Sequence, residues 1–160
     1  MKLIICFCTF LSGVLPAVVQ QTLPHAKPQK VTELKISESS FAQERHYIVT
    51  ADSLLVNFTM NAETGPIHSH FARFISKSER DNLLSSFDKM YLSELKSYYE
   101  GHTDVDHDWT YGISINKNNF IKSTTLFKYK LQPFYVFCKK LNVLLPTSFR
   151  ISYNDSYLKE

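Results

Sequence analysis

Residues 76–109 read SKSERDNLLSSFDKMYLSELKSYYEGHTDVDHDW and join the clearest helix pattern in the chain to its densest group of His and Asp residues. Ser76 and Glu79 have the spacing of a capping box, which predicts that a helix begins directly after Ser76. Apolar residues then recur every three or four positions, as they do along one face of a helix. This stripe consists of Leu83, Leu84, Phe87, Met90, Tyr91, Leu95 and Tyr98. Gly101 suits the left-handed conformation that ends many helices, so we expect one long helix over about 77–99.

The segments on either side of this helix carry the alternating apolar and polar pattern of β-strands. The runs before it are HYIVT (46–50), SLLVNFTM (53–60) and IHSHFARFI (67–75). Gly65-Pro66 marks a turn before the third of these runs. The runs after the helix are WTYGISI (109–115) and FIKSTTLF (120–127), with the turn-rich tetrad NKNN between them. We therefore expect a three-stranded meander before the helix and a two-stranded hairpin after it.

The C-terminal part of the chain predicts a short helix. Pro133 is tolerated at the first helical position, and Pro146 bounds the other end. One face of this helix carries Phe134, Phe137, Cys138 and Leu141. The alternating run 148–153 is a possible last strand. The expected fold is α+β, with an antiparallel sheet in the order β-β-β-α-β-β-α and the possible last strand, covered on one face by one long and one short helix.

The first residues of the chain predict export. Lys2 precedes the apolar run 3–15, which is too short for a stable membrane anchor and suits a secretory signal peptide. We expect a signal peptide over 1–19, a flexible leader over 20–43, a single α+β domain over 44–154 and a frayed tail over 155–160. Within the leader, VTELKI (31–36) alternates and is a candidate edge strand. The expected location is the periplasm or the extracellular medium.

Cysteine content and charge narrow the class of protein. Cys6 and Cys8 lie in the predicted signal peptide, so Cys138 is left alone and no internal disulfide is expected. The formal net charge is +3, and it falls by one, to +2, once Lys2 is removed. This weak and scattered positive charge argues against a nucleic-acid partner and against binding to an anionic membrane surface.

Two groups of residues are candidates for a metal site. The segment HTDVDHD contains His102, Asp104 and His107, which are of types that bind divalent metals. His68 and His70 alternate along a predicted strand, which places both imidazoles on one face about 7 Å apart. The alternative interpretation is a solvated loop and a pair of half-exposed strand histidines. A shared metal site requires that the two groups meet in the folded chain.

Aromatic residues flank the His and Asp segment on both sides. They are Tyr98, Tyr99, Trp109 and Tyr111. Because Tyr and Trp are favoured at binding surfaces, they predict a surface for a protein or glycan partner. The alternative is that Trp109 and Tyr111 face the helix and belong to the core.

No catalytic residues are assigned from the sequence. The chain has no Gly-x-Ser-x-Gly motif, and its four glycines are isolated from one another, so no phosphate-binding loop is expected. We therefore expect a non-enzymatic envelope or secreted interaction module without a cofactor. The alternative is a metal-binding protein or metal-dependent hydrolase that holds a divalent metal through His68, His70 and the segment 102–108.

Overall fold

The computed structural model of the chain describes residues 30–101 and 109–153. Within these ranges the strands are β1 (Glu33–Ser39), β2 (Gln43–Val49), β3 (Ser53–Ala62), β4 (Gly65–Phe74), β5 (Tyr98–Glu100), β6 (Thr110–Lys117) and β7 (Phe120–Phe127). The helices are α1 (Lys77–Asp88) and α2 (Gln132–Leu144), and the short 3₁₀ helices are η1 (Leu92–Glu94) and η2 (Thr147–Phe149).

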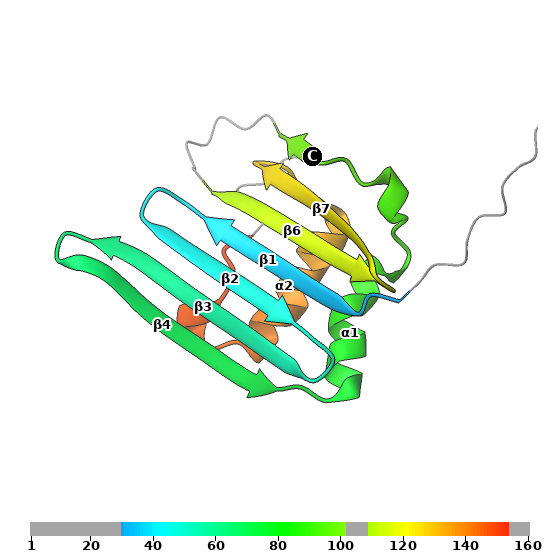
Figure 1. Cartoon of the computed structure of the whole chain (residues 1–160), viewed down its shortest axis with the longest axis horizontal. Coiled ribbons are helices and arrows are strands. Elements are labelled where there is room, and N and C mark those ends of the chain that lie inside the picture. The colour runs from blue at the N-terminus through cyan, green and yellow to red at the C-terminus, as the bar shows by residue number, and fades with distance from the viewer. Residues whose placement is uncertain (1–29, 102–108, 154–160) are drawn as a thin grey trace, which may run out of the picture.

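The strands form one sheet in the order β4-β3-β2-β1-β6-β7-β5, and both helices lie on the same side of it (Figure 1). The core is the layer between the sheet and the helices. The predicted α+β class, with a sheet and two helices, is therefore confirmed. Two details differ from the prediction: the described sheet has seven strands, and β5 runs parallel to β7, so the sheet is not wholly antiparallel.

Strand β1 lies at the centre of the sheet, paired with β2 along one edge and with β6 along the other. Its side chains alternate, and Leu34, Ile36 and Glu38 are buried beneath the helices. The expected flexible leader over 20–43 is therefore wrong for 33–43, and the expected edge strand is a central one. An alternating pattern shows that a segment has one buried face, but it does not show how many strands lie beside it.

Tight turns connect neighbouring strands of the sheet. The hydroxyls of Thr50 and Ser53 lie 2.6 Å apart and close the turn between β2 and β3. Asn118 and Asn119 form the turn between β6 and β7 with φ angles of 48° and 68°, in the left-handed region that Asn tolerates. Gly65, with φ 114°, opens β4 after the turn at 63–64. The asparagine turn lies within the predicted tetrad, whereas Gly65 and Pro66 belong to β4 and the turn itself lies at 63–64.

Helix α1 begins where the sequence predicts. The Ser76 hydroxyl accepts a hydrogen bond from the Glu79 N–H at 3.1 Å, and the Glu79 carboxylate accepts one from the Ser76 N–H at 2.8 Å. This complete capping box pairs two N–H groups that would otherwise lack partners at the start of the helix. Leu83, Leu84 and Phe87 are buried, as the apolar stripe predicts.

Helix α1 ends at Asp88, and the predicted continuation to residue 99 is wrong. The side chain of Lys117, on β6, is only 4% exposed and reaches the end of the helix. Its Nζ donates hydrogen bonds to the carbonyls of Phe87 at 2.8 Å and Met90 at 2.7 Å. In a longer helix these carbonyls would accept from N–H groups four residues further on, and the Lys117 ammonium takes the place of those donors. A cation at a helix C-terminus also interacts favourably with the helix dipole.

The segment after α1 buries apolar residues without continuing the α-helix. Leu92 and Leu95 are buried, whereas Tyr98 is 49% exposed. Gly101 does not cap a helix. Its N–H donates to the Phe127 carbonyl at 3.0 Å, and a Cβ at this position would collide with the backbone carbonyl of Lys128. Glycine is needed there because two backbone segments approach each other closely.

Helix α2 forms as predicted, with Phe134, Phe137, Cys138 and Leu141 all buried. The possible last strand over 148–153 does not form within the described residues: η2 occupies its start, and no strand follows. The Asn142 amide takes both backbone groups of Ile151, accepting from its N–H at 2.9 Å and donating to its carbonyl at 3.0 Å. A side chain thus replaces the neighbouring strand that this segment would need.

Glu38 joins the C-terminal segment to the sheet. Its side chain is wholly buried, and its Oε2 accepts hydrogen bonds from the Tyr47 hydroxyl at 2.8 Å and from the Arg45 guanidinium at 3.1 Å. Its Oε1 accepts from the Ser152 N–H at 2.6 Å. The pKa values of Tyr47 and Tyr111 are raised well above the ordinary value, mainly by burial and secondly by the charge of Glu38. Both phenols therefore stay protonated, and Tyr47 acts as a donor to the carboxylate.

Phe87→Ala should lower the free energy of unfolding by about 3 to 5 kcal/mol, because the ring is fully buried and packs 5.7 Å from the ring of Phe137. Urea titration measures this loss. Phe41→Ala is the matched control, since Phe41 is 94% exposed and its removal should change stability by less than about 0.5 kcal/mol. Equal losses in the two variants would contradict the assigned core.

Lys117→Met should lower stability by about 1.5 to 3 kcal/mol, because buried carbonyls at the end of α1 lose a charged donor while the apolar stem is retained. Lys122→Met, on the neighbouring strand β7, is the control and should stay within about 0.5 kcal/mol of the wild type. Denaturant titration gives both values. Amide hydrogen exchange should also show faster opening in the last turn of α1 in Lys117→Met alone.

The capping box should make stability depend on pH. Hydrogen bonds from Ser76, and to a smaller extent the charge of Arg73, hold the pKa of Glu79 below its usual value. A carboxylate with a lowered folded-state pKa stabilises above its unfolded-state pKa, about 4.3, and this contribution is lost as the pH falls through the folded-state value. Glu79→Ala should therefore be less stable than the wild type at pH 7, and the difference should shrink in acid. Glu63→Ala, in an exposed turn, should show no such convergence in melting curves.

Candidate binding face

The face of the sheet opposite the helices, here called the open face, is not covered by either helix (Figure 1). Side chains alternate along each strand, so the neighbours of buried residues point to this face. On β1, for example, Lys35 and Ser37 alternate with the buried Leu34 and Ile36. The open face is therefore built from the less buried residues of each alternating pattern, most of which are polar.

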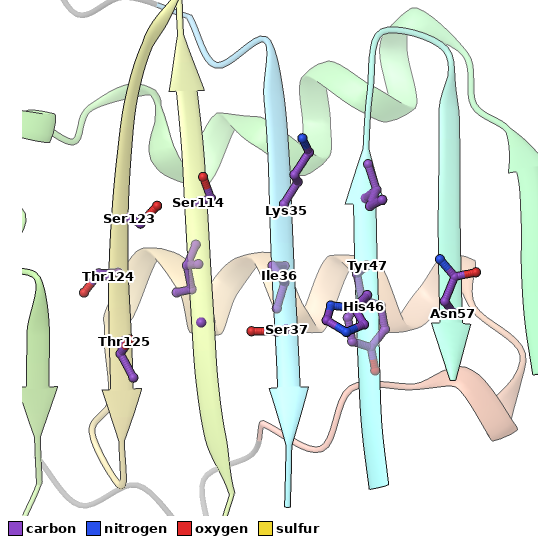
Figure 2. A pocket seen from close by; sticks show the side chains of 13 residues that line it. Lys35, Ile36, Ser37, His46, Tyr47, Asn57, Ser114, Ser123, Thr124 and Thr125 are labelled. Atoms are coloured by element: carbon purple, nitrogen blue, oxygen red, sulfur yellow. The ribbon is translucent and has the colours of Figure 1, made fainter. Parts of the chain in front are cut away.

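A shallow depression of about 470 Å³ lies in the middle of the open face (Figure 2). It is lined on this face by Gly112 and by the side chains of Lys35, Ser37, His46, Ile48, Asn57, Ser114, Ser123 and Thr125. They come from β1, β2, β3, β6 and β7. Four of them carry small hydroxyl side chains, so the floor of the depression can both donate and accept hydrogen bonds.

The strand register places several of these residues in one row across the sheet. Consecutive partners in the row are His70, Asn57, His46, Ser37, Gly112, Thr125 and Tyr98. Adjacent strands lie about 4.8 Å apart, so the part of the row from Asn57 to Tyr98 spans about 24 Å. The surface is depressed in the middle of the row because Gly112 has no side chain. The exposed ring of Tyr98 lies at one end of the row.

Gly112 keeps the depression open. A Cβ at this position would lie 2.5 Å from the Ser37 hydroxyl oxygen, closer than two such atoms can approach. A larger residue at 112 would therefore both fill the floor and displace the Ser37 hydroxyl. Gly112 does not have a positive φ angle. Glycine is therefore needed here because there is no room for a Cβ atom, and not because of its backbone conformation.

The two basic side chains of the depression each have an acidic neighbour. The Lys35 ammonium lies 2.9 Å from the Glu33 carboxylate, and the His46 imidazole lies 2.9 Å from the Glu44 carboxylate. Each basic side chain thus has an acidic neighbour two positions away on its own strand. Such a surface offers hydrogen-bonding groups without a strong field of either sign, and it suits an uncharged polar ligand better than an anion.

The predicted metal ligands His68 and His70 lie on the open face of β4, and both are exposed. The Nδ1 of His68 lies 3.1 Å from the Thr59 hydroxyl on β3. Within 30–101 and 109–153, no three His, Cys, Asp or Glu side chains are grouped so that they could hold a metal ion. The other predicted ligands, His102, Asp104 and His107, lie outside the described residues.

The four predicted aromatic residues do not share one surface. Tyr98 is exposed on the open face, whereas Tyr99 points to the other side and stacks on Tyr129 with ring centroids 4.8 Å apart. Trp109 is partly buried, and Tyr111 is buried. The interpretation of Tyr111 as a core residue is therefore correct, and Tyr98 alone remains next to the depression.

Trp109 and Tyr111 contact other residues of the folded layers. The guanidinium of Arg45 lies 5.9 Å from the centre of the Trp109 ring. The ring of Tyr111 meets that of Tyr153 edge to face, with centroids 4.8 Å apart. Both aromatic residues thus pack at the end of the core that contains Glu38 and stabilise it.

Sequence reasoning missed the residues that line the depression. Ser37, Ser114, Ser123 and Thr125 are small polar residues of a kind that any solvated strand contains. Their one signal is that they occupy the positions between buried residues on three strands. This signal has meaning only once β1 is known to lie beside β6, which the sequence pattern does not show.

Cys138 has no access to a ligand. It is buried in α2, and burial, followed by the charge of Glu38, raises the pKa of its thiol well above the usual value. A protonated and enclosed thiol is a poor nucleophile. The cysteine therefore acts as a small apolar core residue, as its place on the apolar face of the predicted helix indicates.

Comparisons with known proteins leave the chain without an assigned family. No protein-family model matches it, and no curated protein is significantly similar to it in sequence.

Neither α1 nor α2 is both long enough and apolar enough to cross a membrane, and this holds for every helix in the described part of the chain.

Proposed function

We propose that this chain is an exported, non-enzymatic interaction module, periplasmic or secreted, that binds an uncharged glycan on the open face of its sheet. The observation that carries the proposal is the depression around Gly112, which combines small hydroxyl side chains on its floor with an exposed tyrosine beside it. Export rests on the apolar run 3–15 that follows Lys2.

The residues around the depression match the chemistry of a sugar. Hydroxyl groups of a glycan both donate and accept hydrogen bonds, and the Ser37 hydroxyl, the Asn57 amide and the His46 imidazole do the same. The exposed face of the Tyr98 ring offers an apolar surface for the C–H groups of a sugar ring. The carboxylates of Glu33 and Glu44, which lie beside Lys35 and His46, support a neutral ligand over an acidic one.

The shape of the depression supports binding without chemical turnover. It is broad and shallow, and its floor is formed by the strands themselves rather than by loops that could close over a substrate. The residues that line it include no Asp, Glu or Cys. A rigid sheet surface of this kind pre-organises hydrogen-bonding groups for an extended ligand.

Gly112→Val should abolish glycan binding without unfolding the protein. The added side chain fills the floor of the depression, while valine is favoured in a strand. Ala72→Val, on the open face of β4 and outside the depression, is the matched control and should bind like the wild type. A screen of neutral oligosaccharides, followed by calorimetry on the best ligand, measures binding, and circular dichroism checks the fold of each variant.

Tyr98→Ala should weaken binding by about tenfold, which corresponds to the loss of roughly 1.4 kcal/mol of ring stacking. Tyr91→Ala is its control, because Tyr91 is 40% exposed and lies outside the depression. If the wild-type chain binds no neutral oligosaccharide, or if Gly112→Val binds as well as the wild type, the proposed function is wrong. If the open face instead binds a protein, and Gly112→Val blocks that binding, the ligand of this face is a protein and not a glycan.

A further inference from the structure

The outer edge of β4 is open to another strand. β4 is ten residues long and lies at the end of the sheet, where it pairs with β3 along one edge and with no described strand along the other. All ten of its residues are exposed or half-buried. An exposed edge of this length presents unpaired backbone N–H and C=O groups, which favour the addition of a strand.

The side chains of β4 do little to prevent such pairing. Edge strands are usually protected by charged residues, above all lysine, and by proline; β4 has no lysine, and its one proline, Pro66, lies at the start of the strand. Its one permanent charge is Arg73, which lies near the end of the strand and is paired with Glu79 at 2.6 Å. Ile67, by contrast, is 47% exposed on the edge strand.

His68 and His70 place two exposed imidazoles side by side on the edge strand. They point to the same face of β4, about 7 Å apart along the strand. The Nδ1 of His68 lies 3.1 Å from the Thr59 hydroxyl, and the tautomer in which Nδ1–H donates to this hydroxyl leaves Nε2 free to bind a metal. Ordering a ring through its second nitrogen is the usual support of a metal-binding histidine. The described part of one chain supplies no third ligand near this pair.

We propose that two copies of this chain pair antiparallel through their β4 edges, and that His68 and His70 of both copies together bind one divalent metal ion of the zinc class. A two-fold axis perpendicular to the sheet at Ser69 makes the two open faces continuous. In this register His68 lies opposite the partner's His70. The second copy thus supplies the two ligands that a single chain lacks.

The register follows from the side chains of the strand. With the axis at Ser69, Ile67 lies opposite the partner's Phe71, and Arg73 lies opposite the partner's Gly65. Apolar residues then meet apolar ones, and the two guanidinium groups stay apart. Moving the axis to His70 would instead place Ile67 opposite the partner's Arg73 and His68 opposite the partner's Ala72.

The four imidazoles fit one tetrahedral ion. Opposite residues of an antiparallel pair have Cβ atoms about 5 Å apart, and alternate residues of one strand lie about 7 Å apart. Four histidines at the corners of such a rectangle can turn their Nε2 atoms toward a common centre. Zinc accepts four ligands in tetrahedral geometry, with Zn–N distances of about 2.0 to 2.1 Å.

The test measures mass and metal content of the untagged, purified chain with and without ZnCl2. Sedimentation should show the mass of one chain in EDTA and twice that mass with zinc, with one zinc ion bound for two chains. His68→Ala/His70→Ala should abolish the zinc-dependent dimer. His46→Ala, which removes an open-face histidine away from the edge, should dimerise as the wild type does.

A second pair of variants tests the edge itself. Ile67→Lys places a charge opposite the partner's Phe71 and should prevent the dimer, whereas Ile121→Lys, at an isoleucine that is 61% exposed on β7, should not. The proposal is overturned if zinc leaves the chain monomeric, or if Ile67→Lys still dimerises. It is equally overturned if His102→Ala/Asp104→Ala/His107→Ala abolishes the zinc-dependent dimer while His68→Ala/His70→Ala retains it.

Discussion

The arrangement of the sheet and the C-terminal segment depends on the hydrogen bonds of the buried Glu38 carboxylate. It lies on the central strand, and it binds the Tyr47 hydroxyl of β2 and the backbone of Ser152 near the end of the described chain. Arg45 supplies the compensating charge at 3.1 Å. Because an unpaired buried charge costs about 3 to 5 kcal/mol, these groups must be in place together. One side chain therefore couples the two central strands to the C-terminal segment.

The local part of the fold follows from the sequence, and the non-local part does not. The capping box at Ser76, the asparagine turn at 118–119 and the apolar face of α2 each depend on residues within a few positions of one another. The end of α1 depends instead on Lys117, which lies 30 residues from Phe87 in the chain. The absence of a last strand depends in the same way on the Asn142 amide.

The candidate site shows the same division. The alternation of β4 was enough to place His68 and His70 together on an exposed face. The depression around Gly112 depends on a sheet order in which β1 separates β2 from β6, and neither spacing nor composition reveals that order. The His102, Asp104 and His107 ligands remain a prediction, because they lie outside the described residues.

The central place of β1 also governs the order in which the sheet can form. Its pairing with β2 joins neighbouring segments, whereas Ser39 and its partner Thr110 on β6 are 71 residues apart. Contacts that close such long loops form late, since the loop entropy must be overcome first. A chain under synthesis therefore completes β1 to β4 while the edge of β1 is still unpaired. During that interval Leu34 and Ile36 lack their β6 neighbours, and the growing chain is most exposed to aggregation.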